Sequence, residues 1–570
     1  MHDVIIRNAT VCDGTGADAR PGDIAIDGDR IAAVTAPGTL GTGAKSAVRE
    51  LDAGGLVAAP GFIDLHTHYD CQLFWDPTAS PSPWHGVTTV VIGNCGFTIA
   101  PCRPEDRETV MQLLLFVEGM PIDTLRAGIR WSWEEFPDYL GALARQGVGP
   151  NVAAFVGMSA VRFKAMGRAA VERAANAEEI ARMQSIVRDA LAAGAIGWST
   201  SLSPTHFFGD GTPAPTRLSD DAELEAMARV SREFGHGVIE IAPRSLLGTP
   251  DDKLAELDLF DRLARVSGKL VSFAPLHDNP FFPGSAQSIL AAAGDRRARG
   301  ANVVPQVGCR PLELRFDFRA PCFGLENNSF WRPILHEPIE ARRAKFAADE
   351  FRAQLRGYDA SFKALLTPSW ERMFLRVPAI DAHRRLVDVS VAQVARERGV
   401  HPVAAFLDVA LAGDLGDQWG VEVLNADEKG VLELITSPDA VVALSDAGAH
   451  VDTLCDQGYT SYLLGHWVRD LGALRLEDAV AMLSRRPAEL YGLADRGVLA
   501  PGKAADVVLF DPKTVDMRPT EVVDDLPGGQ SRLVQRADGI PYVLVNGRAV
   551  VDRGEPTEAL AGKVLRAGRS

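Results

Sequence analysis

The stretch Gly61-Phe62-Ile63-Asp64-Leu65-His66-Thr67-His68 ends an apolar run in two histidines that are separated by one residue. Alternate side chains of an extended strand point to the same face, so His66 and His68 should project together. Two imidazoles at the end of a buried strand suit a first-row metal such as zinc. A pair of hydrogen-bonded core histidines is the alternative. The metal is favoured because two other strand ends also carry polar groups, Asn94-Cys95-Gly96 and Ser445-Asp446-Ala447-Gly448-Ala449-His450.

Short apolar segments alternate with helical ones through the middle of the chain. Besides the histidine-bearing strand, seven segments have the length and composition of buried strands: 87–94, 152–157, 195–201, 238–243, 270–276, 302–308 and 441–447. Helical segments separate several of them, including 178–193, 220–234, 285–298 and 476–483. Eight β–α alternations favour an α/β fold with a closed (β/α)8 TIM-like barrel, whose reactive groups lie at the C-terminal strand ends. An open doubly wound sheet is the alternative, but no Gly-rich dinucleotide turn follows an early strand.

Both ends of the chain have the alternation and turns of short strands, and neither end can close a core alone. We therefore expect residues 1–57 and 499–570 to form one small β-sandwich domain. The barrel should occupy residues 58–498, with a long insertion at about 309–438. Within it, 341–355 and 391–400 have helical character, and 313–328 has the aromatic and Pro content of a loop. Such an insertion is often a lid or a substrate-binding wall. The alternative is a contact in a homo-oligomer, and we expect the chain to form one.

Composition excludes some partners. The chain has 570 residues, of which 46% are hydrophobic and 24% charged, as in ordinary globular proteins. Its formal charge is −16 and its pI is about 5.3, so neither nucleic acid nor an anionic membrane surface is expected as a partner. No apolar run is long enough to cross a bilayer.

Cysteine content indicates the compartment. Seven cysteines, an odd number without paired spacing, are typical of reduced thiols in a cytoplasmic protein. Residues 1–7 alternate like a strand and contain no cationic region followed by an apolar core, so we expect no signal peptide. We therefore expect a cytoplasmic protein.

Four motifs together resemble the amidohydrolase superfamily, a group of metal-dependent (β/α)8 barrels with a β-sandwich made from both termini. They are residues 60–68 (PGFIDLHTH), Asp446 at the eighth strand end, residues 486–493 (RPAELYGL) and residues 497–506 (GVLAPGKAAD). Residues 86–101 (GVTTVVIGNCGFTIAP) are similar to the D-aminoacylase, or N-acyl-D-amino-acid deacylase, branch. The resemblance implies that Cys95 is a metal ligand.

The chain departs from that branch at two strand ends. Where the branch has a His in a Thr-His-x-Arg setting after the fifth strand, this chain has Ala242. After the sixth strand, His277 comes slightly later than the branch places its histidine, and the neighbouring Lys that binds substrate carboxylate in the branch is missing. The chain therefore resembles a divergent subgroup.

Two imidazoles, a thiolate and a carboxylate are enough for one zinc-like site with room for water. We expect His66, His68, Cys95 and Asp446 to hold one divalent ion, with two ions as the alternative. Asp446 is the natural general base, since it can take a proton from water and hand it to a leaving nitrogen. For Asp446 the alternative is a helix N-cap, and for Cys95 it is a small buried thiol.

Other polar residues follow later strands and complete the candidate site. His206 follows the fourth strand and is a candidate catalytic residue, with a plain loop histidine as the alternative. His277 could be a metal ligand or could stabilise an oxyanion. Arg310 and Arg244, which follow the seventh and fifth strands, could bind a substrate carboxylate through their planar guanidinium groups, and a salt bridge is the alternative for each. His450 could contact substrate or orient Asp446.

The ligand set and the resemblance together imply a metal-dependent hydrolase of a non-peptide C–N bond. The expected substrate is a linear amide, either an N-acyl amino acid or a related small acylamide, which is cleaved by metal-activated water. A cyclic amide or lactone hydrolase with the same metal chemistry is the alternative enzyme. A non-catalytic scaffold of the same fold is the alternative from another class.

Overall fold

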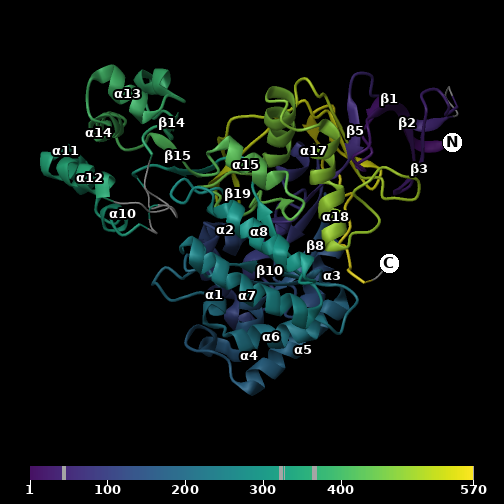
Figure 1. Ribbon diagram of the computed structural model, residues 1–570, viewed down its shortest axis with the longest axis horizontal. Helices are drawn as coiled ribbons and strands as arrows, with labels where there is room; N and C mark the ends of the chain where they lie inside the picture. The colour runs from purple at the N-terminus through teal and green to yellow at the C-terminus, as the bar shows by residue number, and fades with distance from the viewer. Residues whose placement is uncertain (42–45, 320–324, 326–327, 362–368, 569–570) are drawn as a thin grey trace.

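The computed structural model describes residues 1–41, 46–319, 325, 328–361 and 369–568 (Figure 1). Its centre is a curled sheet of eight parallel strands whose order in space follows their order in the chain. These strands are β6 (Phe62–Asp64), β7 (Val87–Ile92), β8 (Asn151–Gly157), β9 (Gly197–Ser201), β10 (Val238–Ala242), β11 (Leu270–Phe273), β12 (Val303–Val307) and β16 (Val441–Val442). All eight predicted strand segments are confirmed.

The first and last strands of this sheet meet just beyond their carboxyl ends. Thr67 and Ala447 form a parallel bridge there, and the His68 N–H donates to the Ala447 carbonyl at 2.7 Å. Residues of β6 to β9 are buried along their whole lengths, as in a parallel sheet that is covered on both faces. The curled sheet therefore fits a TIM-like barrel and brings distant strand ends to one rim.

Helices pack around this sheet. The four predicted ones are α5 (Ala177–Ala193), α6 (Asp221–Ser231), α8 (Ser285–Ala298) and α17 (Leu476–Leu483), and none departs from its expected bounds by more than three residues. The other α-helices described outside the insertion are α1 (Arg107–Val117), α2 (Ile122–Gly128), α3 (Phe136–Gln146), α4 (Met158–Met166), α7 (Pro250–Ser267), α15 (Glu428–Ile435), α16 (Tyr459–Tyr462) and α18 (Arg485–Tyr491). Figure 1 shows α4 to α7 grouped at the bottom of the molecule. No helix among the described residues is long and apolar enough to cross a membrane.

The two ends of the chain pair in one nine-stranded sheet. Strand β17 (Val507–Phe510) lies between β5 (Val57–Pro60) and β22 (Tyr542–Val545), so C-terminal and N-terminal strands are direct neighbours. The other members are β1 (His2–Val11), β2 (Arg20–Asp27), β3 (Arg30–Thr35), β4 (Ala47–Asp52), β23 (Arg548–Asp552) and β24 (Glu555–Pro556). Pairing of the ends is thus observed, whereas their organisation as a sandwich stays a prediction.

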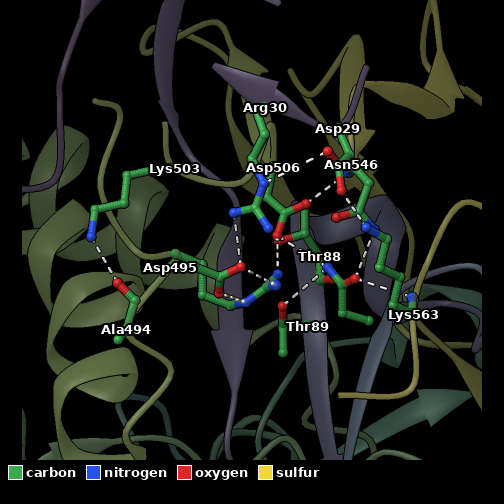
Figure 2. A network of polar contacts seen from close by, with 12 residues as sticks. Asp29, Arg30, Thr88, Thr89, Ala494, Asp495, Lys503, Asp506, Asn546 and Lys563 are labelled. Atoms are coloured by element: carbon green, nitrogen blue, oxygen red, sulfur yellow. Dashed lines mark hydrogen bonds and ion pairs between the residues drawn. The ribbon is translucent and has the colours of Figure 1, made fainter. Parts of the chain in front are cut away.

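A buried polar network joins this terminal sheet to the central one (Figure 2). Asp506 lies at its centre, where it accepts from Arg496 Nη1 at 2.5 Å, from the Asn546 N–H at 2.8 Å and from Asn151 Nδ2 at 3.0 Å. Asn151 begins β8, whereas Asp506 precedes β17. Asp506, the last residue of the 497–506 motif, therefore holds the two sheets together, because these three donors compensate its buried negative charge.

The insertion has a hydrophobic core of its own. Its sheet has the order β13 (Leu312–Phe316), β15 (Gln418–Leu424), β14 (Met373–Val377). Its helices are α10 (Trp331–Leu335), α11 (Ile339–Ala347), α12 (Asp349–Ser361), α13 (Val391–Arg398) and α14 (Pro402–Ala412), and Figure 1 shows most of this part as a green lobe at the upper left. The predicted helix at 341–355 is two helices.

The prediction of a loop at 313–328 was wrong at its start. Leu312–Phe316 is a strand that is paired antiparallel with β15 and is mostly buried. Leu314 and Phe316 of this strand lie in the insertion core, and their alternate spacing favours a pleated strand over a loop. Residues 320–324 and 326–327 of that predicted loop, including Cys322, lie outside the described residues.

Candidate metal centre

Three donor groups converge at the rim where β6 and β7 end. The ligand atoms of His66, His68 and Cys95 all lie within 4.8 Å of one another, and Cys95 Sγ is 3.5 Å from His66 Nε2. Both histidines are buried. Two imidazoles and a thiol form a donor set that fits zinc, so the chemistry of this cluster favours a metal over a pair of core histidines.

Backbone conformation places Cys95 in the cluster. The chain leaves β7 through a tight turn in which Gly93, Cys95 and Gly96 have φ values of 79°, 54° and 76°. Glycine adopts these angles without strain, and it also permits close packing, because a Cβ on Gly96 would lie 3.0 Å from Thr200 Cα. The turn thereby directs the thiol back over the strand end.

Asp446, which follows the last strand of the sheet, completes the cluster at the same rim. Its Oδ1 is 3.1 Å from His68 Nε2 and 3.6 Å from His66 Nε2. Its backbone N–H donates to the His66 carbonyl at 3.2 Å, which fixes the last strand end against the first. The next helix, α16, begins at Tyr459, so the alternative of a helix N-cap at Asp446 is wrong.

Charge in the cluster is tightly coupled. Burial raises the pKa of Asp446, but the hydrogen bond and the charge of His68 outweigh it and hold this pKa well below its usual range. Burial lowers the pKa of His68, whereas Glu118 and Asp446 raise it well above its usual value. Burial lowers the pKa of His66 to about 4, so this imidazole is neutral and able to bind a metal.

Two buried glutamates support the cluster and were not predicted. Glu240, in the middle of β10, accepts the Cys95 N–H with Oε2 at 2.7 Å, and its Oε1 lies 4.0 Å from His66 Nδ1. Its side chain is fully buried, and burial raises its pKa to about 8. Glu118, just after α1, places Oε1 3.2 Å from His68 Nδ1. The sequence contains a signal for Glu240, because a charged residue is unusual within the apolar segment Val238–Ala242. It contains no signal for Glu118, which resembles an ordinary glutamate at a helix end.

A cavity of about 490 Å³ opens over the cluster. Seven predicted site residues line it together with Asp446: His66, His68, Cys95, His206, His277, Arg310 and His450. The convergence of these positions, which follow six different strands, results from the shared rim of parallel strands.

The additional histidines surround the donor cluster. His206 Nδ1 lies 2.5 Å from Ser201 Oγ, and its ring contacts Phe97 edge-on with centroids 5.0 Å apart. Burial lowers the pKa of His206 to about 3 and that of His277 to about 4, so both imidazoles are neutral. His450 Nε2 lies 3.9 Å from Asp446 Oδ2.

The two predicted arginines differ in position. Arg310 lines the cavity, but its Nη1 is 3.0 Å from Asp456 Oδ1 and also donates to the Cys455 carbonyl at 2.6 Å. Arg244 lies outside the cavity in a separate depression, where it pairs with Asp221 at 3.4 Å. The position of Arg244 therefore argues against the predicted substrate contact and favours the alternative of a surface salt bridge.

Comparisons with known proteins agree with this geometry. The model of the Amidohydrolase family matches residues 49–551. An N-acyl-D-glutamate deacylase of Alcaligenes xylosoxydans xylosoxydans is 30% identical over 99% of this chain and 96% of its own length. The crystal structure of D-aminoacylase superimposes with a TM-score of 0.68 at 28% identity, over 99% of this chain and 100% of that one.

A second solved structure is that of an N-acyl-D-glutamate deacylase from Bordetella bronchiseptica, complexed with zinc and a phosphonate inhibitor. It has a TM-score of 0.66 and 26% identity, and the match covers 99% of this chain and 100% of the other. Both the family model and the relatives extend over most of the length of the chain. This chain therefore belongs to the amidohydrolase family, in the branch that includes D-aminoacylase.

Proposed function

We propose that this amidohydrolase uses one divalent ion, zinc, to cleave the C–N bond of a linear amide in an N-acyl amino acid or a related acylamide. His66, His68, Cys95 and Asp446 would hold the ion. The observation that carries this proposal is the cluster of three donors beside Asp446 at the bottom of a cavity of about 490 Å³. Relatives that are named for deacylation of N-acyl-D-amino acids support the choice of substrate class.

The residues around the cavity divide the chemistry between them. When bound, the ion polarises the scissile carbonyl and lowers the pKa of water. Asp446 accepts the proton of the attacking water and delivers it to the leaving nitrogen, a transfer that suits an ionised carboxylate. Neutral His206 and His277 can donate hydrogen bonds to the negative charge that develops on the carbonyl oxygen. Glu118 and Glu240 keep the ligands oriented.

The remaining architecture is proposed on similar grounds. Residues 1–57 and 499–570 would form the β-sandwich domain, supported by the pairing of β17 with β5. The insertion at about 309–438 would be a wall of the substrate site, since Leu312, Leu314 and Asn328 line the cavity. A cytoplasmic homo-oligomer is proposed too. The six cysteines among the described residues are free, which supports that compartment.

Metal quantification combined with a substrate panel tests the function. Purified protein should contain about one zinc per chain and should release amine from linear acylamides, with N-acyl-D- and N-acyl-L-amino acids in the panel. Turnover confined to cyclic imides or lactones would contradict the linear-amide proposal. Protein that has no stoichiometric metal and no hydrolytic activity would favour a scaffold.

The carboxylate of Glu240 should strengthen metal binding. A Glu240→Gln variant keeps the shape and the acceptor for the Cys95 N–H but removes the ionisable carboxyl group next to His66, whose charged form a bound cation would stabilise. We expect zinc affinity to fall by about 10- to 100-fold, as for other groups that orient metal ligands. Competition with a chelator measures this affinity. Glu256→Gln is the matched control, because Glu256 is also buried and accepts two backbone N–H groups, from Arg244 and Ser245, outside the cavity. Equal affinities of the two variants would contradict the role of Glu240.

A further inference from the structure

The charges around the cavity bear on which acylamide it accepts. Arg310 is the one Lys or Arg among the described residues that line the cavity. Its guanidinium is engaged, because Nη1 contacts Asp456 at 3.0 Å, the Cys455 carbonyl at 2.6 Å and Gln535 Oε1 at 3.2 Å. Arg310 and Asp456 have side chains that are only 13% and 12% exposed. Withdrawing Arg310 to bind a substrate carboxylate would leave Asp456 as a buried unpaired charge, which is strongly unfavourable.

Anionic groups outnumber free cations at the same cavity. Glu118, Asp446 and Asp456 all line it, and a metal ion held by the Cys95 thiolate would be largely neutralised by its own ligands. A substrate carboxylate would therefore find no free guanidinium or ammonium on the described lining. Such a group loses its hydration without gaining a partner.

Much of the rest of the wall is apolar. It comes from three segments: the loop between β10 and α7, the loop between β11 and α8, and the insertion. Its side chains are Leu246, Leu247, Phe281, Phe282, Leu312 and Leu314. Leu247 and Phe282 are 51% and 41% exposed, so the mouth presents apolar surface to an incoming molecule. Binding sites of this size gain most of their affinity from covering such surface.

One further cation lies close behind the wall. Lys253, in the first turns of α7, is half-buried, and its charge contributes to the lowered pKa of His277. It is not part of the cavity lining, although Thr249, the cap of the same helix, is. Lys253 is therefore the group through which a carboxylate could still be bound, and the experiment must include it.

On the basis of the proposed function, we propose that the cavity selects neutral acylamides, with apolar groups on both sides of the scissile bond, over N-acyl amino acids that carry a free carboxylate. The selection would come from the absence of a free cation on the described lining and from the apolar wall. The chain would thus differ in substrate charge from relatives that are named for N-acyl-D-glutamate and N-acyl-D-aspartate.

Three related compounds test this proposal: N-acetylleucine in both D and L forms, N-acetylleucinamide, which has the same shape without the charge, and N-(3-methylbutyl)acetamide, the decarboxylated analogue. Release of amine gives kcat/KM, and calorimetry with the zinc-loaded protein gives binding. We expect the neutral compounds to exceed the carboxylate by about 10- to 100-fold, the cost of an unpaired buried polar group. A better carboxylate substrate would overturn the proposal. If none of the compounds is hydrolysed but the neutral ones bind more tightly, the result supports the selection of neutral compounds and contradicts the proposed hydrolysis. Binding that fails to discriminate overturns the selection.

Two variants separate the electrostatic cause from folding defects. Leu247→Arg adds a cation at the exposed mouth and should raise the ratio of kcat/KM for N-acetylleucine to kcat/KM for the neutral compounds several-fold. Leu471→Arg is the control, since Leu471 is 47% exposed and lies outside the cavity. An unchanged preference in Leu247→Arg contradicts the electrostatic cause.

Lys253→Met should leave the preference unaltered. A selective loss of N-acetylleucine turnover in this variant would show that Lys253 binds the carboxylate and would overturn the proposal.

Discussion

An Asp446→Asn variant should lose about 10²- to 10⁴-fold in kcat, the contribution typical of a positioned general base. The amide has the shape of the carboxylate but cannot accept a proton from water. In the native chain the pKa of Asp446 is held well below its usual range by His68, so the base is ionised at neutral pH. Steady-state kinetics on a linear acylamide measures the loss, and zinc content must be determined on the same sample.

Metal content distinguishes the two roles of Asp446. Full zinc occupancy with low kcat identifies the base, whereas lost zinc, with activity restored by excess metal, identifies a ligand. Asp427→Asn is the control, because Asp427 caps α15 by accepting the Gly430 N–H at 3.2 Å and asparagine caps equally well. Near-normal kcat in zinc-loaded Asp446→Asn would exclude Asp446 as the base.

The central strands could be predicted from sequence because their physical causes are local. Most are short, largely apolar segments that must be covered on both faces, and helices separate several of them. The sheet then forces the convergence of His66, Cys95 and Asp446, since parallel strands present their carboxyl ends at one rim. A pattern within each segment was therefore enough to identify a site built from residues far apart in the chain.

The features that could not be predicted from the sequence depend on the direction in which each loop leaves the rim of the sheet. Arg244 and Arg310 both follow strands directly, yet one points to a separate depression and the other into the cavity. Nothing in the local sequence sets that direction. Glu118 supports His68 only because the chain brings the residues after α1 over the rim. The strand at Leu312–Phe316 was hidden for a similar reason, as its partner β15 is about a hundred residues away.

Removal of the thiol should have the largest effect on metal binding. In Cys95→Ser a hydroxyl, which stays neutral and binds zinc weakly, replaces a thiolate. The loss of zinc affinity should exceed the 10- to 100-fold loss that we expect for Glu240→Gln, because Cys95 is a ligand and Glu240 only orients ligands. Chelator competition compares the two variants with the native protein. Cobalt substitution gives an independent measurement, since the sulfur-to-cobalt absorption of the native protein should disappear.

The same variant should change how metal binding depends on pH. Burial and the nearby carboxylate of Glu240 raise the pKa of the Cys95 thiol in the metal-free chain, so metal must displace its proton. Affinity therefore rises with pH, and the rise should be less steep in Cys95→Ser. Cys102→Ser is the matched control, because Cys102 is also buried but its thiol lies against the Arg103 carbonyl. If Cys95→Ser bound zinc as tightly as Cys102→Ser, with the same dependence on pH, Cys95 would be a buried thiol and the site would have only imidazole and carboxylate ligands.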